Sequence, residues 1–153
     1  RGLGDVYKIQ VKILNKEAND RSGLIYGMGH AVYTLSDPRA VILKKKAFEL
    51  AEGKEIEADF RLLNTIERLT PEIFKEVKGS DKVVCANVDM YSGLVYKMLG
   101  IPSDLYTPLF AVSRIVGWAA HRMEEILTGS RIIRPAYKAI AKPRKYIPLS
   151  ERD

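Results

Sequence analysis

The sequence has one cysteine, two histidines and no apolar run approaching the ~20 residues that a membrane-spanning helix needs. A single cysteine cannot form an internal disulfide, which is typical of proteins in a reducing compartment. We interpret Cys85, which follows Val83 and Val84, as a small buried side chain rather than a nucleophile. The first residues lack the apolar core of a signal peptide. These absences favour a cytoplasmic protein, or one of an organelle matrix, that binds no membrane.

Signals for several common ligand classes are also missing. The sequence has no Cys/His spacing typical of a metal site, no phosphate loop and no internal repeat. Residues 131–145 contain basic but no acidic side chains, within a chain of net charge +6. Such a segment can bind phosphate backbones, but no nucleic-acid-binding module accompanies it, so we interpret it as a solvated tail. Position 1 is not methionine, and we expect the chain to be part of a longer protein.

Helical periodicity is what the sequence does contain. Its 153 residues, 46% hydrophobic and 29% charged, suffice for one globular domain or two small subdomains. Residues 1–22 predict a short amphipathic helix, whose apolar face needs a partner, and a polar linker. A second helix should begin at Pro38, after the capping residue Asp37, and end near Glu52, before Gly53.

The pattern continues through the rest of the chain. A helix is predicted over about residues 54–68, and a short one restarts at Thr70-Pro71 by the same cap-and-proline logic. In the first of these two helices, four apolar side chains should face inward: Ile56, Phe60, Leu63 and Ile66. Lys82–Ala86 should be a buried connection without a partner strand, and the longest helix should run from Thr107-Pro108 to Gly129. The sequence therefore predicts an all-α fold.

Gly27 and Gly29 form the loop that precedes His30. Glycine allows sharp turns and a close approach of the backbone to a ligand, and histidine exchanges protons near neutral pH. Arg39 falls in the first turn of the helix that begins at Pro38. A histidine with an arginine behind it indicates a site for an anionic substrate that needs a proton. Gly-x-Gly alone leaves an ordinary loop equally open.

Asp89 lies at the start of the helix that follows Asn87. A carboxylate at this position is by default an N-cap. The functional alternative is a base held close to free backbone N–H groups, and the local pattern leaves both interpretations open.

Four motifs, taken in order, resemble the C-terminal part of one known family, the citrate synthases. They are Gly27-Met28-Gly29-His30-Ala31-Val32-Tyr33 with Asp37-Pro38-Arg39-Ala40, Asn87-Val88-Asp89-Met90-Tyr91-Ser92-Gly93, Ser113-Arg114-Ile115-Val116-Gly117-Trp118 with Ala120-His121, and Ile133-Arg134-Pro135. The resemblance implies a mainly helical homodimer of the tricarboxylic acid cycle that condenses an acyl-CoA with oxaloacetate. It further implies a helical small domain that binds CoA over residues 23–105, after a linker and partial helix in residues 1–22. Residues 106–153 would be a long helix and tail of the large domain.

The resemblance also implies a role for each matched residue. Asp89 would take a proton from the acetyl methyl group, and His30 would donate to the ketone oxygen of the acceptor. Arg39, Arg114 and Arg134 would bind the acceptor's carboxylates, with Arg134 reaching the neighbouring subunit's site. The backbone of the loop Ile25-Tyr26-Gly27-Met28-Gly29 would recognise the adenine of CoA. CoA is then a co-substrate, and we expect neither a permanently bound cofactor nor a metal.

The sequence departs from the family pattern at two points. The family uses a further histidine, upstream of the glycine loop, at the thioester oxygen, and residues 1–29 contain no histidine. Thr34 stands where some members carry a basic contact to a CoA phosphate, and the nearest substitutes are Lys44, Lys45 and Lys46. We therefore expect the isolated chain to be inactive.

Two alternative functions stay open. One is a 2-methylcitrate synthase, whose propionyl-CoA substrate differs by one methylene from acetyl-CoA. The other is a non-catalytic helical module that binds CoA or a protein partner. We interpret His121 as a structural residue of the last long helix, and Tyr91 and Tyr96 as core residues.

Overall fold

The computed structural model describes residues 2–129, 142 and 145–152. The chain divides into two compact units, residues 1–110 and residues 111–153. The described residues form α-helices and short 3-10 helices and no strand, which confirms the predicted all-α class. None of these helices is both long enough and apolar enough to cross a membrane. The expected domain limits at residues 22 and 105 stay predictions.

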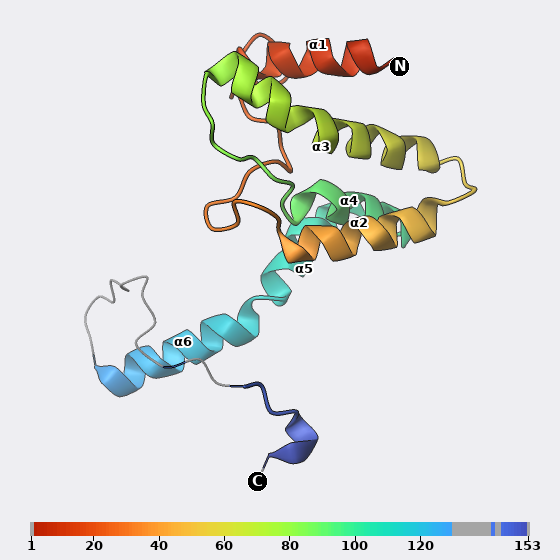
Figure 1. Ribbon diagram of the computed structural model, residues 1–153. Helices are drawn as coiled ribbons and strands as arrows, with labels where there is room; N and C mark the ends of the chain where they lie inside the picture. The colour runs from red at the N-terminus through yellow and green to blue at the C-terminus, as the bar shows by residue number, and fades with distance from the viewer. Residues whose placement is uncertain (1, 130–141, 143–144, 153) are drawn as a thin grey trace. The chain divides into compact units, whose positions relative to one another are not determined.

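The first helix, α1 (Leu3–Leu14), lies along α3 (Glu57–Lys78) (Figure 1). Val6, Gln10 and Leu14 are buried on the inner face of α1. Across from them α3 buries Thr70 and Ile73, so α3 is the partner that the apolar face of α1 required.

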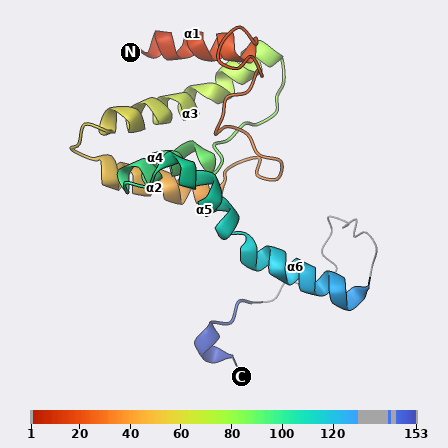
Figure 2. The same cartoon turned by 180° about the vertical axis from the view of Figure 1, so that it is seen from behind.

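The main hydrophobic core lies between α2 (Pro38–Ala51), α3 and α4 (Asp89–Met98). The view from behind shows α2 and α4 side by side, on the face of α3 opposite α1 (Figure 2). Helix α2 contributes three buried alanines, Ala40, Ala47 and Ala51, whose small side chains allow α4 to pack closely. Tyr91 of α4 is fully buried, as predicted for a core residue.

Local capping sets the ends of α2 as predicted. The Asp37 side chain accepts a hydrogen bond from the Arg39 backbone N–H at 3.0 Å, and Pro38 occupies the first turn. The helix ends at Ala51, and Gly53 has φ +71°. Val41 and Ile42, which also fit the helical spacing, are 57% and 63% exposed. The alanines, not these two residues, therefore form the buried face.

Helix α3 corrects the prediction of two helices, because it runs unbroken through Pro71. Proline removes one helical hydrogen bond and usually ends or kinks a helix. Here contacts on both sides of it hold the helix together. Thr70 Oγ1 lies 2.7 Å from the Ile66 carbonyl oxygen and 2.8 Å from Gln10 Oε1, while Ile73 is buried. As predicted, Phe60 is buried, and Ile56, Leu63 and Ile66 pack against the core.

The segment predicted as the longest helix is also corrected. It forms α5 (Tyr106–Val112) and α6 (Ile115–Thr128), after a short 3-10 helix, η1 (Ser103–Leu105). The break falls at Ser113 and Arg114, within a run of weak helix formers that includes Val112, Ile115 and Gly117. Of the helices described, α3 is the longest, with 22 residues. Gly129 ends α6 as expected, with φ +61°. A second 3-10 helix, η2 (Leu149–Glu151), follows near the C-terminus.

Candidate active site

The connection before α4 pairs with the glycine loop. Met28 and Ala86 form an isolated antiparallel bridge. In this bridge the Gly29 N–H donates to the Cys85 carbonyl at 2.7 Å, and the Asn87 N–H donates to the Gly27 carbonyl at 2.9 Å. This pairing fixes the loop against the segment that leads into α4. As predicted, residues 82–86 have no partner strand, because the bridge at Ala86 is isolated. Val84 and Ala86 are buried as expected, whereas Val83 is 52% exposed.

Gly27 brings the loop into contact with α4 itself. Its φ is +84°, and a Cβ built on it would lie 2.9 Å from Met90 Cα. Gly29 also has a positive φ, +90°, but a Cβ there would meet only Val84 Cγ1 at 4.0 Å. At position 27 glycine is required both by the backbone conformation and by the close approach to α4.

His30, directly after this loop, is held by backbone hydrogen bonds. Its Nδ1 accepts from the Val32 N–H at 3.0 Å and from the Tyr33 N–H at 3.1 Å. The neutral ring therefore carries its proton on Nε2, because a nitrogen that accepts hydrogen bonds has no hydrogen of its own. The Tyr33 ring packs against the imidazole with centroids 4.7 Å apart. His30 can thus donate a hydrogen bond from Nε2.

Arg39 lies beside that nitrogen, with Nη2 3.4 Å from His30 Nε2. Two bonds to Asp37 fix the guanidinium: Nη2 to Oδ2 at 2.8 Å and Nε to Oδ1 at 3.0 Å. Asp37 is 1% exposed. Its hydrogen bonds from Arg39 hold the pKa of the Asp37 carboxyl below its usual value and raise the pKa of Arg39. A neutral N–H donor and a fixed cation therefore lie side by side, which suits an anionic, oxygen-bearing ligand.

Asp89 is exposed in the first turn of α4. Its backbone N–H donates to Asn87 Oδ1 at 2.9 Å, and Asp89 follows the N-cap residue Val88, so the Asp89 side chain does not cap α4. The negative charge of Asp89 is the smallest of the causes that raise the pKa of Arg39, after the hydrogen bond and charge of Asp37. Asp89 also borders a hollow of about 410 Å³. Its other lining residues are Val88, Ser92, Gly93, Tyr96, Tyr106, Thr107 and Phe110.

The structure places the remaining candidates as follows. Ile25 is half-buried, and Tyr26 is 65% exposed, with its hydroxyl donating to Asp20 Oδ2 at 2.5 Å. This bond is the main cause that lowers the pKa of Asp20 to about 2.

Arg114 precedes α6 in the second unit, and Arg134 lies outside the described residues. The structure thus brings His30 and Arg39 together, and leaves the positions of the other two arginines relative to them open.

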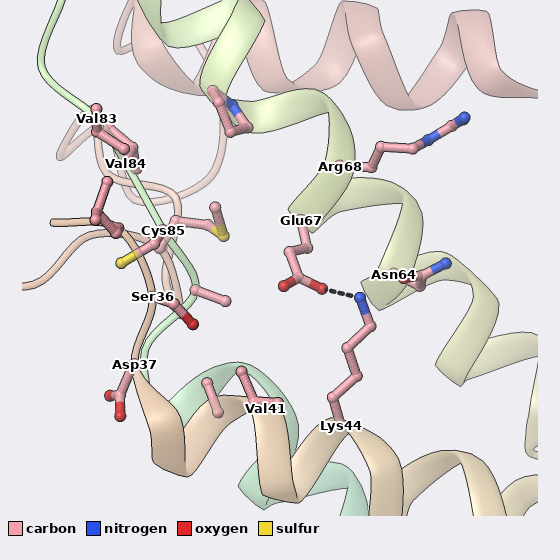
Figure 3. A pocket seen from close by; sticks show the side chains of 15 residues that line it. Ser36, Asp37, Val41, Lys44, Asn64, Glu67, Arg68, Val83, Val84 and Cys85 are labelled. Atoms are coloured by element: carbon pink, nitrogen blue, oxygen red, sulfur yellow. Dashed lines mark hydrogen bonds and ion pairs between the residues drawn. The ribbon is translucent and has the colours of Figure 1, made fainter. Parts of the chain in front are cut away.

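A pocket of about 470 Å³ lies between α2, α3 and residues 83–86 (Figure 3). Inside it Lys44 Nζ is 2.7 Å from Glu67 Oε2, and the Tyr91 hydroxyl donates to the same carboxylate. Burial and this bond raise the pKa of Tyr91. Cys85, expected to be buried, is partly exposed in this pocket, and its thiol lies 3.4 Å from the Tyr33 carbonyl oxygen.

Each lysine considered as a CoA phosphate contact has an acidic neighbour. Lys44 pairs with Glu67, as described, while Lys45 Nζ and Lys46 Nζ lie 4.0 Å and 2.8 Å from the Glu49 carboxylate.

His121 in α6 is 84% exposed at its side chain and lies 3.9 Å from Glu124. Tyr96 is half-buried and packs against Tyr106 with ring centroids 5.1 Å apart.

Sequence reasoning missed Asn87. Its side-chain Nδ2 donates to the Gly29 carbonyl at 2.9 Å, in addition to the bond from the Asp89 N–H to Oδ1. An asparagine two residues before a helix start is a known capping signal and could have been noticed in the sequence. Its link to Gly29 could not, because it spans 58 residues.

Comparisons with known proteins show which proteins this chain is similar to. The family model "Citrate synthase, C-terminal domain" matches residues 5–136. The chain is 40% identical over 151 residues to a citrate synthase of Synechocystis, covering 98% of this chain and 36% of that protein. It is 37% identical over 134 residues to a 2-methylcitrate synthase of Shewanella oneidensis, covering 87% and 33% of the two chains.

A solved structure gives the same result. The citrate synthase of Thermoplasma acidophilum, in a ternary complex with carboxymethyl coenzyme A and oxaloacetate, matches with a TM-score of 0.63 and 31% identity. The match covers 97% of this chain and 42% of the other. The chain spans about a third of the length of the curated relatives. On these sequence and structural matches, the chain belongs to the citrate synthase family, as its C-terminal portion.

Proposed function

We propose that this chain is the C-terminal part of a citrate synthase, an acyltransferase that condenses acetyl-CoA with oxaloacetate and releases citrate and CoA. The observation that supports this most strongly is that the His30 Nε2 donor lies 3.4 Å from the fixed Arg39 guanidinium, after a loop that Asn87 joins to the Asp89 backbone. Family membership supplies the substrates, and the relative solved with a CoA analogue and oxaloacetate supports that choice.

In the proposed reaction each residue acts on one group of the substrates. The Asp89 carboxylate removes a proton from the methyl carbon of acetyl-CoA. The resulting enolate carbon attacks the ketone carbon of oxaloacetate, whose oxygen takes up negative charge. His30 Nε2–H donates to that oxygen, where the stabilisation is largest in the transition state. Water then cleaves the thioester, so that citrate and CoA leave.

The arginines and the glycine loop bind the substrates in this proposal. Arg39, Arg114 and Arg134 hold the oxaloacetate carboxylates, with Arg134 acting at the site of the neighbouring subunit of a homodimer. Residues 25–29 recognise the adenine of CoA through their backbone. CoA is a co-substrate rather than a bound cofactor. Because the chain lacks an upstream histidine and most of the length of its relatives, we expect the 153 residues alone to be inactive.

The test is a CoA-release assay with acetyl-CoA and oxaloacetate, on the product of the complete reading frame and on the 153-residue chain. We expect activity in the longer product only, and Asp89→Ala should lower kcat by about 10²–10⁴-fold, as for loss of a general base. Asp5→Ala is the matched control, because Asp5 also lies in the first turn of a helix but in α1. Activity of the 153-residue chain that depends on Asp89 would contradict the expected inactivity, and a longer product without activity would contradict the proposed function.

A second candidate is 2-methylcitrate synthase, which the relative from Shewanella oneidensis favours. One methylene in an apolar pocket changes kcat/KM by about 10- to 200-fold. The ratio of kcat/KM for propionyl-CoA and acetyl-CoA therefore separates the two candidates. If neither thioester is consumed but CoA still binds, the chain serves as a binding module.

A further inference from the structure

Asn87 makes three hydrogen bonds that meet at the candidate site. Its backbone N–H donates to the Gly27 carbonyl at 2.9 Å. Its side-chain Nδ2 donates to the Gly29 carbonyl at 2.9 Å, and its Oδ1 accepts from the Asp89 N–H at 2.9 Å. One half-buried residue thus contacts both the loop and the start of α4.

The two side-chain bonds end at the positions that matter most for the proposed chemistry. Gly29 directly precedes His30, and the peptide that joins them carries the carbonyl that Asn87 binds. The other bond ends on Asp89 itself. The planar amide has both atoms in a fixed geometry, so it sets the distance between the His30 backbone and the Asp89 backbone.

We infer that Asn87 is a positioning residue, whose amide holds the proton donor His30 and the base Asp89 at the separation that carbon–carbon bond formation needs. This inference rests on the proposed function. In the proposed reaction, Asn87 does not contact the reacting atoms. The residue acts by keeping the loop that carries one group in register with the helix that carries the other.

The expected effect is on kcat rather than on substrate binding. A displacement of about 1 Å between reacting groups can lower a rate about 10²-fold. Arg39 binds the acceptor but is held by Asp37, which does not depend on Asn87. Loss of the Asn87 link should therefore lower kcat by about 10- to 100-fold and leave KM for oxaloacetate near its wild-type value.

Two variants separate this role from simple capping. Asn87→Ala removes both side-chain bonds. Asn87→Ser keeps a short acceptor for the Asp89 N–H, since serine caps in the same way, but it cannot reach the Gly29 carbonyl. We expect Asn87→Ser to recover the Tm lost in Asn87→Ala but not the kcat. Asn64→Ala is the matched control, because Asn64 lies in α3 and its side chain makes no hydrogen bond to the described residues.

The assay is steady-state CoA release by the complete protein, together with thermal unfolding. Wild-type kcat in Asn87→Ser, or an equal loss in Asn64→Ala, would overturn the inference. A rise in KM for oxaloacetate without a fall in kcat would also overturn it, because that result assigns Asn87 to binding. A wild-type protein that releases no CoA contradicts the proposed function instead.

The link itself can be tested without activity. In the 153-residue chain, the Asn87 side-chain amide protons should exchange with solvent more slowly than those of Asn64, as seen by NMR. Equal exchange rates at the two amides would remove the structural basis of the inference, whether or not the protein is a citrate synthase.

Discussion

At the scale of single residues, Gly27 shows how a side chain that is missing can position a site. A Cβ at this position would lie 2.9 Å from Met90 Cα and 2.7 Å from Met90 Sδ. The methionine sulfur can move away, but the helix backbone cannot without shifting α4. The sequence suggested that the glycine serves a close approach to a ligand, whereas the structure shows a close approach to α4.

We therefore predict that Gly27→Ala destabilises the chain more than Gly53→Ala does. Gly53 has φ +71°, and a Cβ added to it would meet nothing within 4 Å, so both substitutions share the conformational cost but only the first creates a clash. The difference in the free energy of unfolding should be about 1–3 kcal/mol, as for overpacking. Urea denaturation of both variants measures it. Equal losses would mean that α4 moves aside freely.

Asp37 gives a prediction of pH dependence. Its folded-state pKa is lowered, mainly by the hydrogen bond from Arg39, so the native state binds fewer protons than the unfolded state in acid. The stabilisation is therefore fully present above the unfolded pKa of about 3.9 and is lost as the pH falls through the folded pKa.

We expect Asp37→Asn to destabilise the chain at pH 7 by about 1.5–3 kcal/mol, as for a hydrogen bond to a charged group. This difference from wild type should shrink as the pH falls below about 4. Urea denaturation over a series of pH values measures it. Asp5→Asn is the control, since Asp5 has no arginine partner among the residues described. If the two variants change the pH dependence of the unfolding free energy alike, the ion pair between Asp37 and Arg39 does not contribute to stability.

At the scale of elements, α3 depends on α1 where Pro71 interrupts its hydrogen bonding. Thr70 Oγ1 contacts both the Ile66 carbonyl and the buried Gln10 amide. Thr65 Oγ1 makes the equivalent bond to the Arg61 carbonyl, at 2.8 Å, and has no partner on another helix in the part of the chain that the structure describes. The two threonines therefore form a matched pair within one helix.

We predict that Thr70→Val lowers the free energy of unfolding by about 1–3 kcal/mol more than Thr65→Val, because Gln10 is left buried without its partner. Urea denaturation, followed by circular dichroism, measures both variants. The double variant Gln10→Leu with Thr70→Val should recover part of the loss, since two apolar groups replace a broken polar pair. No recovery would indicate that Thr70 acts only within α3.

At the scale of the whole molecule, α6 carries an apolar face that its own unit leaves exposed. Ile115, Val116, Met123, Ile126 and Leu127 share this face and are 58–83% exposed. Exposed apolar patches of this kind promote association. The chain spans about a third of the length of its curated relatives.

We expect the isolated 153-residue chain to self-associate through this face. Sedimentation equilibrium over a range of concentrations should show species heavier than 17.2 kDa. Replacing Val116 and Leu127 with glutamate should shift the chain toward the monomer. Leu99→Glu, which removes an exposed leucine outside α6, should not. A chain that stays monomeric at every concentration would contradict this prediction.

The helical class and several helix ends could be predicted from the sequence alone, because these depend on neighbouring residues. Asp37-Pro38 caps α2, and Gly129 ends α6, through interactions within one turn. The order of the four motifs also identified the family, since residue types and spacings are properties of the chain alone. The break at Ser113 and Arg114 was missed although the weak helix formers around it are visible in the sequence.

Which segments come together in space could be seen only in the folded chain. The continuity of α3 through Pro71 depends on Gln10, which is 60 residues away in the chain from Thr70. The pairing of the glycine loop with residues 85–87 and the double link of Asn87 follow from contacts between the loop and the segment that leads into α4. The proton position on His30 follows instead from two bonds within the loop. Local patterns carry no information on such contacts, because their energy depends on packing and hydrogen bonds between segments far apart in the chain.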